Sequence, residues 1–162
     1  MMTARPYDAV LCDIEGVIRH AAICGSADRA HAAVTDWSNL VPHADHDVLS
    51  LLTQARTVVP VASVSNATTP GNGPRRQGLD DLADDVVNTP RIRLMKPDAR
   101  AYVKAAAQPG APIHHCLFID DTGANVTAAR EVGITALHYR QIEDLRSALA
   151  PLLNTAPDAQ HT

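Results

Sequence analysis

One short stretch limits what this chain can fold into more than any other. Residues 10–19 read VLCDIEGVIR, an apolar run interrupted by two carboxylates, Asp13 and Glu15, and then by Gly16. An apolar run of this length that ends at a glycine is typical of a buried strand. Carboxylates at the end of such a strand need a cation or hydrogen-bond donors, because an unpaired charge is costly to remove from water. The stretch therefore predicts a strand that delivers two acids to a polar site.

Four further segments have the pattern of strands, and helical patterns lie between them. The strands are predicted at 9–13, 61–65, 85–87, 116–120 and 134–138, and the helices at 47–56, 98–107, 122–132 and 141–153. Asp98 is a predicted N-cap, and Gly133 is predicted to follow a helix end. Because strands that alternate with helices form crossover units, we predict an α/β fold, a Rossmann-like, doubly wound and mostly parallel sheet of five strands.

The length of 162 residues predicts a single domain. We expect a core at 1–153, a short insert at about 20–42 and a flexible tail at 154–162. The net charge of −4 gives no basic footprint for nucleic acid or an acidic membrane, and no apolar run approaches the ~20 residues of a membrane span. Cys12 and Cys116 lie in or beside apolar runs and predict buried free thiols, and therefore a cytoplasmic protein.

Polar residues follow the ends of the predicted strands in a repeated pattern. They are Asp13 and Glu15 after the first strand, Ser65 and Asn66 after the second, Lys96 before a helix, and Asp120 and Asp121 after the fourth strand. Because the carboxyl ends of parallel strands share one edge, these side chains are expected to converge there. Crowded carboxylates repel one another unless a cation joins them, and Mg²⁺ prefers oxygen ligands. A carboxylate nucleophile, a second acid, a hydroxyl, an amine and Mg²⁺ are the parts required for phosphoryl transfer through an aspartyl-phosphate.

These segments resemble, in order, the four motifs of the haloacid dehalogenase-like (HAD) hydrolases. The matching segments are 10–17 (VLCDIEGV), 64–67 (VSNA), 96–98 (KPD) and 117–122 (LFIDDT) with Asn125. The resemblance extends from residue 9 to about residue 153. It implies an HAD-like core and a hydrolase that works through a phosphorylated aspartate.

The resemblance also implies catalytic roles. Asp13 is expected to be the nucleophile, and Glu15 the general acid and base. Ser65 and Lys96 are expected to be catalytic groups that also bind the phosphoryl group, together with Asn66. The alternative for Ser65 is a turn cap, and the alternative for Lys96 is a solvated surface residue.

The metal site implied by the resemblance holds Mg²⁺. Its expected ligands are Asp13, Asp120, Asp121 and the backbone carbonyl of Glu15, with Asn125 as a candidate supporting residue. The alternative for the aspartate pair is capping of the helix that begins near residue 122, which one acid could satisfy while the other binds metal.

Two departures from the family pattern affect the prediction. Glu15 stands where the family usually has aspartate, and the added methylene moves the carboxyl group by about an ångström. However, the enolase-phosphatase branch of the family also carries Asp-x-Glu-Gly, so Glu15 does not by itself imply an inactive enzyme. The insert at 20–42 is short where relatives carry a helical cap, which predicts an open site for a large substrate or a homodimer whose partner covers it.

Taken together, the residues predict an Mg²⁺-dependent phosphatase for a phosphorylated substrate that the sequence does not identify. Two alternatives stay open. The first is a binding or scaffold protein with an HAD fold, suggested by Glu15 and the short insert. The second is a 2-haloacid dehalogenase that uses Asp13 to attack carbon, and the acidic pair Asp120 and Asp121 argues against it because that reaction needs no metal.

Overall fold

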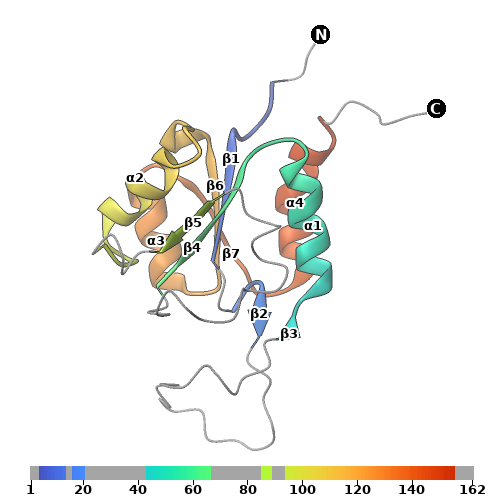
Figure 1. Ribbon diagram of the computed structural model, residues 1–162, viewed down its shortest axis with the longest axis horizontal. Coiled ribbons are helices and arrows are strands. Elements are labelled where there is room, and N and C mark those ends of the chain that lie inside the picture. Colours follow the sequence, from blue (N-terminus) through green and yellow to red (C-terminus); the bar gives the residue numbers. More distant parts are fainter. Residues whose placement is uncertain (1–3, 14–15, 21–42, 67–84, 89–93, 156–162) are drawn as a thin grey trace, which may run out of the picture.

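The described residues of the computed structural model are 4–13, 16–20, 43–66, 85–88 and 94–155. They contain a five-stranded parallel sheet in the order β5-β4-β1-β6-β7 (Figure 1). The strands are β1 (Ala9–Asp13), β4 (Val61–Ser65), β5 (Asp85–Asn88), β6 (Cys116–Asp120) and β7 (Thr135–His138). The predicted fold class and all five predicted strands are confirmed.

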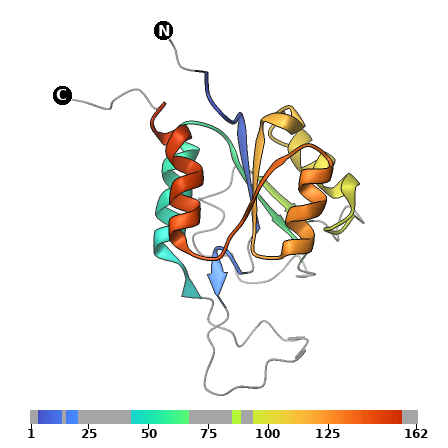
Figure 2. The same ribbon diagram turned by 180° about the vertical axis from the view of Figure 1, so that it is seen from behind.

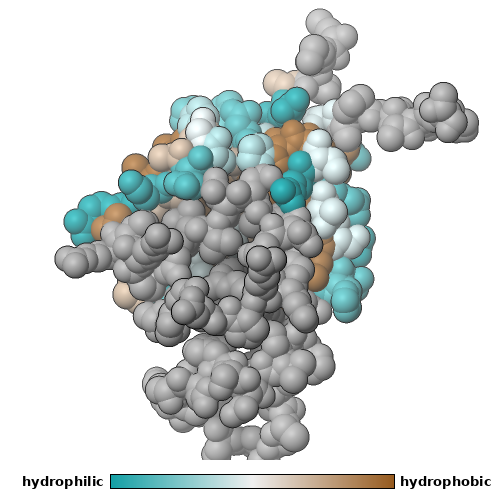
Figure 3. Space-filling view, in the orientation of Figure 1, coloured by the Kyte–Doolittle hydropathy of each residue, from teal (hydrophilic) through white to brown (hydrophobic). Residues whose placement is uncertain are grey.

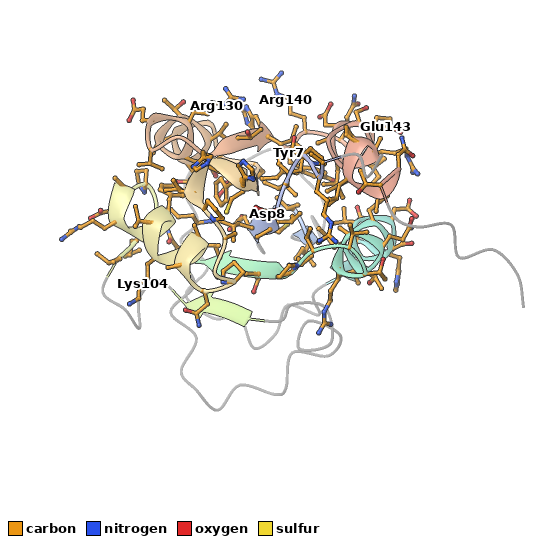
Figure 4. The ribbon with its side chains drawn as sticks, turned by 90° about the horizontal axis from the view of Figure 1, so that it is seen from above. Tyr7, Asp8, Lys104, Arg130, Arg140 and Glu143 are labelled. Atoms are coloured by element: carbon orange, nitrogen blue, oxygen red, sulfur yellow. The ribbon has the colours of Figure 1, made fainter. Side chains whose placement is uncertain are left out.

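Helices cover both faces of the sheet. They are α1 (His46–Arg56), α2 (Ala99–Ala107), α3 (Gly123–Glu131) and α4 (Ile142–Leu153), with a short 3-10 turn at Ile113–His115. The views from behind and from above place α1 and α4 on one face, and α2 and α3 on the other (Figures 2 and 4). The predicted ends are confirmed: the Asp98 carboxylate accepts a hydrogen bond from the Arg100 amide at 2.9 Å, and Gly133, just after α3, has φ +94°.

The apolar core consists of two layers, one on each side of β1. Val10 and Cys12 pack in the layer with α1 and α4, whereas Ala9 and Leu11 pack in the layer with α2 and α3. Alternate residues of a strand face opposite sides, so a strand buried on both faces is apolar throughout. All five residues of β1 are buried, as the central strand of the sheet requires, and the strand carries Asp13 to the carboxyl edge of the sheet.

Parallel register brings the strand ends to the same level. Asp13 of β1 lies opposite Val64 of β4, and Cys12 lies opposite Ile119 of β6. Asp120 follows Ile119 and ends β6, so it lies beside Asp13, which follows Cys12 and ends β1. This edge is where a doubly wound sheet binds its ligand.

Two very short strands lie at the same edge. β2 (Arg19–His20) and β3 (His43–Ala44) pair antiparallel, below the sheet in Figure 1. They were not predicted, because two residues are too few to show a pattern. Residues 21–42 of the expected insert lie outside the described residues, as do 156–162 of the expected tail.

The two described cysteines, Cys12 and Cys116, are free and buried, as predicted. Among the described residues, the helices are too short or too polar to span a membrane. On the face shown in Figure 3, hydrophilic residues over α1 and α2 alternate with hydrophobic ones. The large hydrophobic side chains exposed among the described residues are Met95 and Val103, and single exposed residues of this kind are ordinary on protein surfaces.

Candidate active site

A buried lysine joins the ends of three strands. The Lys96 ammonium donates hydrogen bonds to Asp13 Oδ1 at 2.5 Å, to Asp120 Oδ2 at 2.8 Å and to the Val64 carbonyl at 3.1 Å. An ammonium group has three protons, and these acceptors use all of them. Lys96 is only 5 % exposed, so the alternative of a solvated surface lysine does not hold, and its ammonium lies at the centre of the predicted site.

The surroundings of Lys96 keep its ammonium charged. Burial acts to lower the pKa of this group, but the charges of Asp13 and Asp120 and hydrogen bonds to both raise it, and the net shift is upward. The ammonium also lies 5.6 Å from the centre of the Phe118 ring, a favourable cation–π distance. Beside Asp13, burial raises the pKa of the Cys12 thiol well above its usual range, and the charge of Asp13 adds to this, so the thiol stays neutral.

Asn66 fixes the backbone of Lys96. Its Nδ2 donates to the Lys96 carbonyl at 2.9 Å, and its Oδ1 accepts from the Lys96 amide at 3.0 Å. The two residues are thirty positions apart in sequence, at the end of β4 and before α2. Asn66 was predicted to bind substrate, and the structure shows it as the residue that holds Lys96 in place.

Asp120 is fully buried and surrounded by donors. Its Oδ2 accepts from Lys96 and from the Asn125 amide at 3.0 Å, and its Oδ1 accepts from the Thr122 backbone at 2.8 Å. Tyr102 supports the same turn of α3, because its hydroxyl donates to the Asn125 carbonyl at 2.9 Å. Asp120 thus fixes the turn that leads into α3, whose N-cap residue is Thr122 and whose first turn receives no side-chain capping hydrogen bond.

Asp121 is the exposed member of the pair. Burial, although partial, and the neighbouring charge of Asp120 raise its pKa, while a hydrogen bond from the Thr122 hydroxyl at 3.3 Å opposes that shift. Gly16 of the loop after β1 lies directly against its carboxylate. Gly16 has φ +88°, and a Cβ atom at this position would overlap the Asp121 carboxylate. The glycine is therefore required both by the backbone conformation and by the close approach of the acid.

Three carboxylates at this edge fit a divalent cation. Asp13, Asp120 and Asp121 each offer an oxygen atom, and these atoms lie within 4.8 Å of one another. The single buried ammonium of Lys96 offsets one of the three negative charges. An oxygen donor set with excess negative charge suits Mg²⁺ better than softer metals.

The structure brings together most of the predicted site residues. Asp13, Lys96, Asp120 and Asp121 form one cluster, as the sequence predicted. Ser65 is buried at the end of β4, one residue beyond the partner of Asp13. Glu15, the predicted general acid and base, lies outside the described residues.

One residue of this edge was missed by the sequence analysis. His138 ends β7, and its Nε2 lies 2.9 Å from the backbone carbonyl of Asp121. The available signal was weak: a single histidine at the end of the last predicted strand, without a partner at a recognisable spacing. In the sheet His138 pairs with Asp120, and the contact of its ring with Asp121 shows that the imidazole lies beside the acids.

Gly16→Ala is expected to weaken cation binding at this edge. The methyl group strains a left-handed backbone by about 1–2 kcal/mol and also displaces the Asp121 carboxylate. Gly133→Ala is the matched control, since Gly133 also has positive φ but no described atom lies within 4 Å of its Cβ position. Both variants should lose stability in urea unfolding, and only Gly16→Ala should lose Mg²⁺ affinity in calorimetry. Equal Mg²⁺ affinities would contradict the contact.

Most of the chain matches the model of a known protein family. The model of the haloacid dehalogenase-like hydrolases matches residues 9–133. This match includes the strands β1, β4, β5 and β6 and every residue of the acidic cluster. None of the curated proteins matches the chain.

Solved structures share the fold. An uncharacterised protein from Corynebacterium glutamicum is 22 % identical over 91 % of this chain and 95 % of its own, with a TM-score of 0.67. An HAD-superfamily hydrolase of subfamily IA from Geobacter sulfurreducens is 16 % identical over 88 % of this chain and all of its own, with a TM-score of 0.68. An HAD-family enzyme from Bacteroides thetaiotaomicron, solved with magnesium and inorganic phosphate, is 20 % identical over 60 % of this chain and 53 % of its own, with a TM-score of 0.52.

Proposed function

Because the chain belongs to the haloacid dehalogenase-like hydrolases, we propose that it is an Mg²⁺-dependent phosphatase that forms an aspartyl-phosphate on Asp13. The observation that carries the proposal is the cluster itself, in which Lys96 contacts Asp13 and Asp120 while Asp121 lies within reach of the same ion. The magnesium and phosphate in the Bacteroides enzyme support the same chemistry.

In the first step, a carboxylate oxygen of Asp13 attacks phosphorus and the ester P–O bond breaks. The proton on Glu15 passes to the leaving oxygen, so an alcohol departs and Asp13 carries the phosphoryl group. Lys96 keeps the Asp13 carboxylate oriented and balances its charge before attack. Ser65 would orient the phosphoryl oxygens at the end of β4.

In the second step, Glu15, now a carboxylate, takes a proton from water. The water oxygen attacks phosphorus, the bond to Asp13 breaks, and inorganic phosphate leaves with Glu15 protonated again. Asp13, Asp120 and Asp121 would hold Mg²⁺, with the Glu15 carbonyl that the family resemblance adds. When bound, the ion would neutralise the charge on the phosphoryl oxygens.

A ligand-stabilisation measurement tests the site. Mg²⁺ and beryllium fluoride, a mimic of the aspartyl-phosphate, are expected to raise the unfolding temperature far more together than separately. Binding to the folded state alone stabilises by about 2.7 kcal/mol at a ligand concentration of 100 Kd. In parallel, hydrolysis of para-nitrophenyl phosphate should require Mg²⁺ and stop on addition of chelator.

The outcomes separate this proposal from its alternatives. A protein that neither ligand stabilises, alone or combined, would be a binding or scaffold protein that has kept only the fold. Release of halide from a 2-haloacid in the presence of chelator would instead indicate a dehalogenase. The three acids argue for the phosphatase, because attack on carbon needs no cation.

The substrate and assembly are part of the proposal. We expect a phosphorylated compound and no nucleic acid or membrane partner, with a homodimer as one way to cover an open site. A panel of phosphate esters from small metabolites to phosphoproteins, assayed with Mg²⁺, would identify the class. Light scattering at the assay concentration would show whether the active species is a dimer.

A further inference from the structure

We propose that His138 is a positioning residue for Asp121, and that it sets the preference of the site for Mg²⁺ over larger cations. This inference rests on the proposed metal site and deepens it. It assigns a role to a side chain on β7, a strand that contributed no residue to the predicted site.

The contact between the two residues fixes the protonation of the ring. His138 Nε2 lies 2.9 Å from the Asp121 carbonyl oxygen. A carbonyl oxygen can only accept, so Nε2 must carry a proton and donate it. The imidazole therefore holds the backbone of Asp121 and leaves the carboxylate of that residue for the cation.

Asp121 depends on this contact because it lies just beyond the sheet. The pairing of β6 with β7 ends at Asp120 and His138, and Tyr139 donates to the Asp120 carbonyl at 2.9 Å. Asp120 is thus fixed by the ladder and by three donors to its side chain. Asp121 follows without a ladder partner among the described strands, and His138 supplies the donor that its carbonyl accepts.

Asp121 has a close neighbour at its carboxylate and another at its backbone carbonyl. Gly16 lies against its carboxylate, so closely that a Cβ atom would overlap it. The His138 ring lies at the start of α3, where a Cβ atom on Gly123 would be 3.6 Å from ring atom Cε1. Asp121 therefore has Gly16 against its carboxylate and His138 bound to its carbonyl, so loss of the imidazole frees the backbone that carries the carboxylate.

The identity of the cation makes this positioning measurable. Mg²⁺ requires ligands at about 2.0–2.1 Å in nearly ideal octahedral geometry, whereas Ca²⁺ accepts about 2.3–2.6 Å and irregular arrangements. A displacement of Asp121 by a few tenths of an ångström would therefore weaken Mg²⁺ binding more than Ca²⁺ binding. Loss of a hydrogen bond that orients a ligand residue typically lowers metal affinity about 10–100-fold.

The experiment is calorimetric titration of the whole protein with Mg²⁺ and with Ca²⁺, without substrate. His138→Leu should lose about 10–100-fold in Mg²⁺ affinity and distinctly less in Ca²⁺ affinity. His138→Gln should recover most of the Mg²⁺ affinity, because its amide nitrogen can donate from a similar distance. His114→Leu is the control, since His114 is exposed in the turn before β6, at the opposite edge of the sheet.

Each outcome decides the proposal. Unchanged Mg²⁺ affinity in His138→Leu would overturn it, and so would an equal loss for both cations that glutamine does not restore. If the leucine variant fails to fold in urea titrations, His138→Ala answers the same question without the added bulk. A wild-type protein that binds neither cation would refute the metal site itself. A wild-type protein that binds Mg²⁺, with a His138→Leu variant of equal Mg²⁺ affinity, would refute only the role of His138.

Discussion

Asp13→Asn is expected to lower phosphate-ester hydrolysis by at least about 10³-fold while the protein stays folded. The amide has the same shape as the carboxylate, but it lacks the charged oxygen that attacks phosphorus. Lys96 keeps Asp120 as a charged partner at 2.8 Å, so the fold should tolerate the change. Steady-state turnover of para-nitrophenyl phosphate with saturating Mg²⁺ measures the loss.

Two further variants make the result specific. Asp8→Asn removes a carboxylate just before the other end of β1, where Asp8 pairs with His115, and should leave turnover unchanged. Glu15→Gln should slow hydrolysis of the intermediate, so that mass spectrometry detects a phosphoryl group on Asp13. Undiminished turnover in Asp13→Asn would exclude the aspartyl-phosphate mechanism.

Lys96→Met is expected to lower the free energy of unfolding by about 3–5 kcal/mol. Methionine has a similar length but no charge, so Asp13 and Asp120 are left buried against each other. One of them must then take up a proton in the folded state, which means that the folded state binds more protons than the unfolded state. Stability of this variant should therefore fall as pH rises from about 5 to 7, as urea titrations at several pH values would show.

A lysine-to-methionine substitution at an exposed position is the control for Lys96→Met. Lys104→Met removes an exposed lysine of α2 that points away from the sheet (Figure 4), and its effect should stay within about 0.5 kcal/mol. Adding Asp120→Asn to Lys96→Met should recover part of the loss, because only one buried charge then remains. A Lys96→Met protein as stable as Lys104→Met would show that the ammonium does not hold the strand ends together.

The elements of the fold could be predicted because each has a strong local pattern. The buried strand at Ala9–Asp13 is apolar up to its last residue, and the helix after Asp98 has both a cap and an apolar face. The acids could be placed at one edge because parallel strands end together. These inferences need only neighbours in sequence and one rule of topology.

The rest depends on contacts that no local pattern records. Asn66 and Lys96 are joined by two hydrogen bonds across thirty positions, and His138 reaches Asp121 from a different strand. The sequence placed Asn66 at a strand end but did not show that its side chain binds the backbone of Lys96. β2 and β3 were missed for another reason, since each pairs over only two residues.

The pairing of β2 with β3 affects how much the length of the segment between them can vary. His20 and His43 lie opposite each other, so the two ends of the segment between them are held side by side. The entropy of closing a loop between fixed ends grows only with the logarithm of its length, about 0.6 kcal/mol for each doubling. The core can therefore accept a longer or shorter segment here at little thermodynamic cost. The edge of the sheet that carries the acids thus has beside it a position where new recognition elements can be added without rebuilding the fold.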